Sequence, residues 1–130
     1  GSLASTLWTP NFEPYYNNKM KIIKKKYNDF VLIVSTFYKT NNVENESDYN
    51  EIVKNESKFQ FRFANKKEEN LRLKALKEDH KLFVKFAKFV DEISKKNPKL
   101  NFVIRLHPLE QKNKWKNFIS NQNGNIYRLL

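Results

Sequence analysis

The chain has 130 residues, of which 39% are hydrophobic and 15% aromatic, which is enough for one domain with one core. The absence of cysteine and the presence of only two histidines exclude disulfides, thiolate metal sites and histidine-rich metal sites. A formal net charge of +11 attracts anionic partners, although a lysine- and asparagine-rich composition can also reflect codon usage and does not by itself establish nucleic-acid binding.

The first 13 residues predict an extended lead-in, in which Gly1-Ser2 resembles the remnant of a tag. Pro14 suits the first turn of a helix. The apolar side chains that then recur at helical spacing are Tyr16, Met20, Ile23 and Tyr27. Lysines fill most of the other positions. We expect an amphipathic helix lying on a sheet, and the alternative is a basic helix that docks on a membrane surface.

The run FVLIVS, residues 30–35, is continuously apolar between turn signals. It predicts a strand buried on both faces, as in parallel sheets. Ser35 and Thr36 lie at its carboxyl end, where they either donate hydrogen bonds to a phosphate or close a turn.

The segment after this strand is polar and irregular from residue 38 to 47, and residues 48–56 predict a short helix. The run KFQFRF, residues 58–63, alternates and predicts an edge strand of the core, or a segment made helical by its context. Alternating aromatics and cations also occur on RNA-binding sheets, but the glycines of that motif are absent.

The longest predicted helix covers residues 66–97 and is stopped by Asn97-Pro98. Its apolar stripe is thinner over residues 70–77, where the helix could break. We interpret His80, one turn before Phe83, as a packing histidine.

The stretch NFVIRLHPLE, residues 101–110, begins as a strand and ends as a polar loop. Arg105 and His107 project to one side if the extended conformation reaches that far. Pro108 ends the strand, and Glu110 follows at the start of the next helix. Ligands of open α/β sheets bind at this carboxyl edge, although ordinary surface charges at a strand end fit the pattern equally well.

A helix over residues 110–120 and a strand over residues 126–129 complete the chain. The alternation of helices and strands predicts an α/β, Rossmann-like parallel sheet with flanking helices on both faces.

Several features, in this order, resemble the nucleotide-binding half of bacterial surface-carbohydrate biosynthesis proteins, relatives of capsule Kdo transferases and teichoic-acid polyol-phosphate transferases. The features are Pro10 to Phe12, the basic helix running into KKYNDFVLIVSTF at residues 25–37, Asn97-Pro98, the Arg105-x-His107-Pro108 stretch with Glu110, Trp115, and a short strand after an Asn/Gly turn. Leu106 and Leu109 depart from the proline and serine common in that family, and Ser35-Thr36-Phe37 departs from its Asn-Thr-Asn type of run.

The resemblance implies a single GT-B-type half domain over residues 14–130, truncated at its C-terminus. It implies that His107 contacts the donor phosphate, with Arg105 and Glu110 beside it in the catalytic site and Ser35 and Thr36 in the donor-binding site. The donor would be a CMP- or CDP-activated sugar or polyol, with no metal and no separate cofactor. We expect the half domain to be inactive alone, because a GT-B site forms between two domains, and to pair with a second domain or with itself.

Two functions are therefore consistent with the sequence. The first is a donor-binding, glycosyltransferase-like domain for surface polysaccharide synthesis, located in the cytoplasm or at the inner face of the membrane. The second is a non-catalytic basic module that binds nucleic acid or an anionic surface. The first needs a focused site at Arg105 and His107, whereas the second needs a lysine face with a steep salt dependence. Of these partners, we expect a nucleotide-sugar and not nucleic acid.

Overall fold

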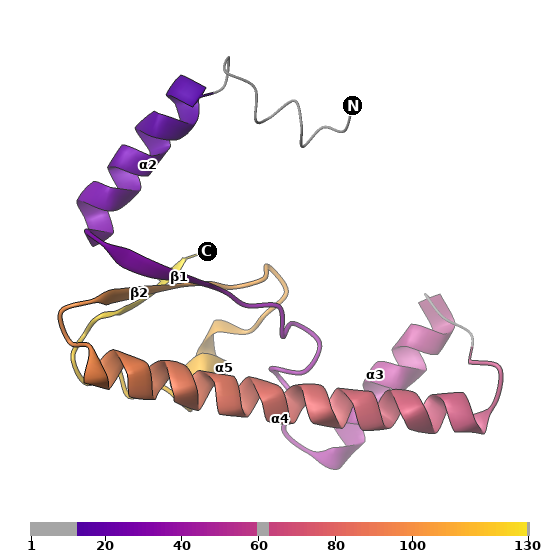
Figure 1. Ribbon diagram of the computed structural model, residues 1–130. Coiled ribbons are helices and arrows are strands. Elements are labelled where there is room, and N and C mark those ends of the chain that lie inside the picture. Colours follow the sequence, from indigo (N-terminus) through magenta and orange to yellow (C-terminus); the bar gives the residue numbers. More distant parts are fainter. Residues whose placement is uncertain (1–12, 60–62, 130) are drawn as a thin grey trace.

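The computed structural model describes residues 13–59 and 63–129 (Figure 1). The predicted lead-in, including Pro10 to Phe12, lies almost entirely outside these residues, as does the middle of the predicted strand over residues 58–63. The elements are, in chain order, α2 (Glu13–Tyr27), β1 (Phe30–Val34), α3 (Glu46–Phe59), α4 (Lys66–Lys96), β2 (Asn101–Arg105), α5 (Lys112–Lys116) and β3 (Ile126–Leu129).

The three strands form one parallel sheet in the order β1-β2-β3. Helices α3 and α4 connect β1 to β2, and α5 connects β2 to β3. In the register, Val34 of β1 and Leu129 of β3 both pair with Arg105 of β2. The predicted α/β class and the three predicted parallel strands are therefore confirmed, with helices beside the sheet.

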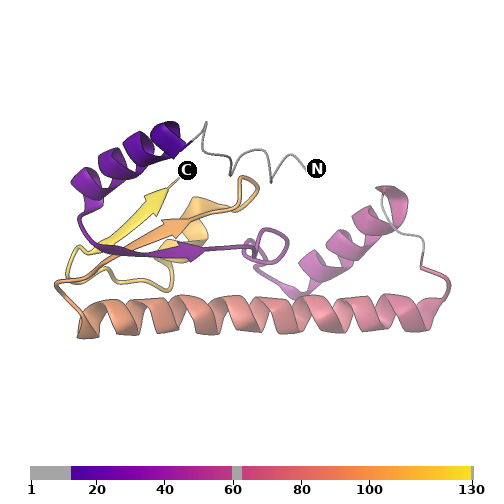
Figure 2. The ribbon, with the colours of Figure 1, turned by 45° about the horizontal axis from the view of Figure 1, so that its top comes forward.

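The main core lies between the sheet and α4, which runs beneath all three strands (Figure 2). Alternate residues of β2 supply its centre, because Phe102 and Ile104 project toward α4 and are almost fully buried. The core residues that meet them are Ile33, Phe83, Ala87, Val90, Leu106, Trp115 and Ile126. The Phe83 ring meets the Trp115 ring edge-on at a centroid distance of 5.3 Å, so α4 and α5 cover the same face.

A second, smaller core joins α3 to the N-terminal half of α4, where α3 begins against α4 before the two helices diverge (Figures 1 and 2). It contains Tyr49, Val53 and Leu76. The Asn65 side chain caps α4 by accepting a hydrogen bond of 3.0 Å from the backbone N–H of Glu68. With Leu76 buried against α3, α4 continues unbroken through residues 70–77.

Two expectations about burial are wrong. β1 is an edge strand in which only Ile33 is buried, while Val31, Leu32 and Val34 are 40%, 50% and 57% exposed. Helix α2 does not lie along the sheet but rises away from it, on the side opposite α4 (Figure 1). The ring of its last residue, Tyr27, packs against the ring of Tyr127 with a centroid distance of 5.2 Å. Helix α2 therefore covers that face of the sheet only at its C-terminal end.

Two predicted boundaries also differ. Lys58 and Phe59 belong to the last turn of α3, so this part of the predicted strand is helical. Helix α5 has five residues in place of the predicted 110–120, because Glu110 closes a turn and residues after Lys116 leave the helical path. Trp115 is buried as predicted.

The core assignment predicts unequal effects for two phenylalanines of α4. Phe83→Ala removes a fully buried ring and should lower the free energy of unfolding by about 3–5 kcal/mol. Phe89→Ala, at a side chain 54% exposed, should change it by less than about 0.5 kcal/mol. Urea unfolding measures both, and equal losses would contradict this core.

Candidate ligand site at the carboxyl edge of the sheet

The carboxyl ends of β1 and β2 lie side by side, as parallel pairing requires. The backbone N–H of Ser35 donates to the carbonyl oxygen of Arg105 at 2.9 Å, which continues the strand ladder by one residue. Ser35, Thr36 and Arg105 therefore reach the same edge of the sheet, where open α/β sheets bind ligands.

A buried hydrogen bond connects this edge to the turn that follows β2. The Ser35 hydroxyl donates to Oε1 of Glu110 at 2.6 Å, and the two residues are 2% and 7% exposed. The backbone N–H of Glu110 donates to the carbonyl oxygen of His107 at 2.9 Å. Glu110, predicted as a catalytic residue, thus fixes the turn over residues 107–110, while its Oε2 has no hydrogen-bond partner among the residues that the structure describes.

His107 is held from two sides. Its ring stacks on that of Tyr38, with a centroid distance of 4.2 Å and an interplanar angle of 21°. The backbone N–H of Leu109 donates to Nδ1 of His107 at 3.2 Å, so the neutral ring carries its proton on Nε2. This tautomer provides an N–H donor at Nε2.

Arg105 and Thr36 complete the set of predicted site residues. Both are exposed, and Arg105 forms no ion pair with any residue in the described part of the chain. The structure thus brings Ser35, Glu110 and His107 into one bonded unit and leaves Arg105 beside it with its guanidinium available to a ligand.

The loop after β1 contributes residues that the sequence did not point to. Thr40 donates from Oγ1 to Oδ2 of Asp79 at 2.5 Å, and its carbonyl oxygen lies 2.8 Å from Nδ1 of His80. Asn41 donates from Nδ2 to the carbonyl oxygen of Gln111 at 3.3 Å. The His80 ring also packs against the rings of Tyr49 and Phe83, with centroid distances of 6.3 and 6.2 Å, as expected of a packing histidine. Through Asp79 and His80, α4 holds the loop that presents Tyr38.

A buried charge network supports the same loop. Glu56 is 7% exposed and accepts hydrogen bonds from Lys39 at 2.8 Å and from Arg72 at 2.6 and 2.7 Å. These bonds, chiefly those from Arg72, lower the pKa of Glu56 from 4.5 to about 2 against the opposing effect of burial. The Lys39 ammonium also lies 5.9 Å from the Tyr38 ring centroid.

The described residues contain no cluster of three or more histidine, aspartate or glutamate side chains that could hold a metal ion. Comparisons with protein-family models, with curated proteins and with solved structures found no match.

The charge network predicts a loss of stability in acid. Because the pKa of Glu56 is lower in the folded state than its ordinary value of 4.5, ionised Glu56 stabilises the fold above pH 4.5, and this stabilisation is lost as the pH falls toward 2. Glu56→Gln should therefore be less stable than wild type at pH 7, and the difference should shrink between pH 4.5 and about 2.

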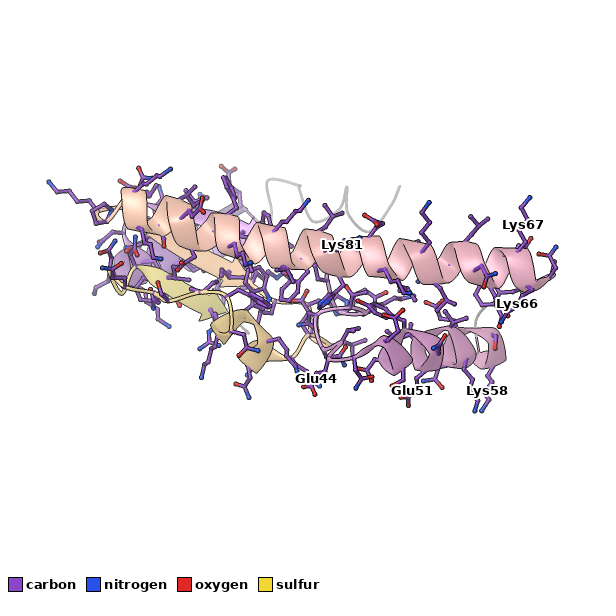
Figure 3. The ribbon with its side chains drawn as sticks, turned by 90° about the horizontal axis from the view of Figure 1, so that it is seen from below. Glu44, Glu51, Lys58, Lys66, Lys67 and Lys81 are labelled. Atoms are coloured by element: carbon purple, nitrogen blue, oxygen red, sulfur yellow. The ribbon has the colours of Figure 1, made fainter. Side chains whose placement is uncertain are left out.

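Urea unfolding at several pH values measures this difference. Glu51→Gln is the matched control, because the Glu51 carboxylate is exposed on the same helix (Figure 3) and should hardly matter for stability. A Glu56→Gln variant as stable as wild type at pH 7 would contradict the assignment.

Proposed function

We propose that the edge around His107 binds the phosphate of a nucleotide-activated sugar or polyol, as the donor-binding half of a glycosyltransferase-like protein for surface polysaccharide synthesis. The observation that carries the proposal is the fixed His107 ring, stacked on Tyr38 and oriented by Leu109, beside an Arg105 that forms no ion pair with the residues the structure describes. The family resemblance of the ordered motifs supports a CMP- or CDP-linked compound as the donor.

The side chains at the edge differ in what they can offer a phosphate. Arg105 can donate two parallel hydrogen bonds to phosphate oxygens. His107 offers Nε2–H as a donor in the tautomer that the Leu109 N–H selects. Thr36 is exposed and offers a hydroxyl, whereas the hydroxyl proton of Ser35 is already committed to Glu110. Helix α5 begins only at Lys112 and has five residues, so we assign no phosphate contact to its N-terminus.

In transfer, the bond between the donor group and the nucleotide's phosphate oxygen breaks as the acceptor attacks, and negative charge grows on the leaving phosphate. Arg105 and His107 would stabilise that charge, which is the usual source of rate enhancement in such displacements. Glu110 would act as a positioning residue, because its carboxylate orders the turn that holds His107. The acceptor would approach from a second domain, so we expect this chain alone to bind the donor without transferring it.

The direct test is an NMR titration of the protein with CMP. Amide shifts should cluster at residues 35–38 and 105–110, with weak affinity. His107→Ala should weaken binding by about 1.5–3 kcal/mol, typical of one hydrogen bond to a charged group, or roughly 10- to 150-fold. Arg105→Lys keeps the charge but loses the paired donors and should also weaken binding.

Two controls separate a focused site from general attraction to the basic chain. Arg128→Lys makes the same exchange at an exposed arginine on β3, and replacement of Lys24, Lys25 and Lys26 by glutamine removes three charges from α2. Both should leave the affinity for CMP nearly unchanged. Shifts that follow α2, or the absence of shifts at millimolar CMP, would refute the donor site.

A further inference from the structure

The largest unexplained feature of the described structure is helix α2, which stands clear of the other helices (Figures 1 and 2). Among its apolar side chains, Tyr15, Met20 and Ile22 are 58%, 48% and 64% exposed. An amphipathic helix normally buries such side chains, whereas the described residues leave these three exposed.

The charge of α2 indicates the kind of partner. The helix carries five lysines against a single acidic residue, Glu13, at its first position. Successive residues of an α-helix are about 100° apart around its axis. On this basis an apolar arc of about 160° contains Tyr15, Tyr16, Met20, Ile22 and Ile23. The opposite side contains Lys21, Lys24 and Lys25. Three of the five lysines are thus segregated from the apolar arc.

The other two lysines, Lys19 and Lys26, lie inside the apolar arc, and each places its ammonium group near an aromatic ring. The Lys19 ammonium is 5.7 Å from the Tyr15 ring centroid, and the Lys26 ammonium is 5.0 Å from that of Tyr27. Long side chains of this kind keep their methylene groups with apolar surface while their ammonium groups reach lipid phosphates.

We propose that α2 docks this protein on an anionic membrane surface, with the apolar arc in the interface and the lysines on the headgroups. The helix lies on the bilayer and does not cross it, in keeping with the finding that no helix among the described residues is long and apolar enough to span one. Helix α4 also exposes Leu71, Leu82 and Phe89, but the same face carries both glutamates and lysines, among them Glu78, Glu92, Lys74 and Lys85. Helix α2 has a single acidic residue, at its first position, so the proposal is made for α2.

The test is co-sedimentation of the full chain with vesicles of phosphatidylcholine alone or mixed with phosphatidylglycerol. The protein should sediment with the anionic vesicles only, and raised salt should release it. Glutamine at positions 21, 24 and 25 should lower the partition coefficient by roughly tenfold or more, because each lysine near an anionic surface contributes to binding. Ile22→Asp should also lower it.

Matched controls come from α4. Glutamine in place of the exposed Lys74, Lys85 and Lys88 removes the same charge, and Leu82→Asp makes the same exchange as Ile22→Asp; both should bind nearly as wild type. His107→Ala should bind vesicles normally, so failure of the donor site leaves this result unaffected. Equal binding to neutral vesicles, equal loss in the α4 variants, or no sedimentation would overturn the proposal. Tighter lysine-dependent binding to single-stranded RNA than to anionic vesicles would overturn it in favour of nucleic acid.

Discussion

The hydrogen bond from Ser35 to Glu110 is the interaction on which the candidate site depends. It joins residues 75 positions apart in the sequence, and both side chains are almost fully buried. A buried carboxylate is costly unless it is hydrogen-bonded, so the turn that carries Glu110 is held against the end of β1. His107 lies within this turn, and its position follows from the same bond.

Three segments then meet at one edge of the sheet, each held by a different part of the molecule. Pairing of β1 with β2 fixes Ser35 and Arg105. The turn fixed by Glu110 presents His107, and the loop that presents Tyr38 is held to α4 through Asp79 and His80. Helix α4 also packs against the sheet in the main core, so the same helix contacts both the core and the loop at the candidate site.

The sequence was sufficient for much of this arrangement, because local patterns carry the relevant information. The alternation in NFVIR predicts the central strand, and the rule for parallel strand ends brings Ser35, Arg105, His107 and Glu110 to one edge. The role of Tyr38 was not predictable, since its loop depends on contacts with residues about 40 and 70 positions away. The prediction that β1 is buried on both faces was wrong. An apolar run shows that a strand can be buried, but burial also requires another element that covers each face. Helix α2 supplies that cover only at Tyr27.

The most direct measurement is a double-mutant cycle on Ser35→Ala and Glu110→Ala, using the free energy of unfolding at neutral pH, because each change removes one partner of the hydrogen bond. A buried hydrogen bond to a charged group predicts a coupling of about 1.5–3 kcal/mol between the two positions. Additive effects within about 0.5 kcal/mol would show that the two side chains do not interact, and would contradict the constraint that places His107 at the edge of the sheet.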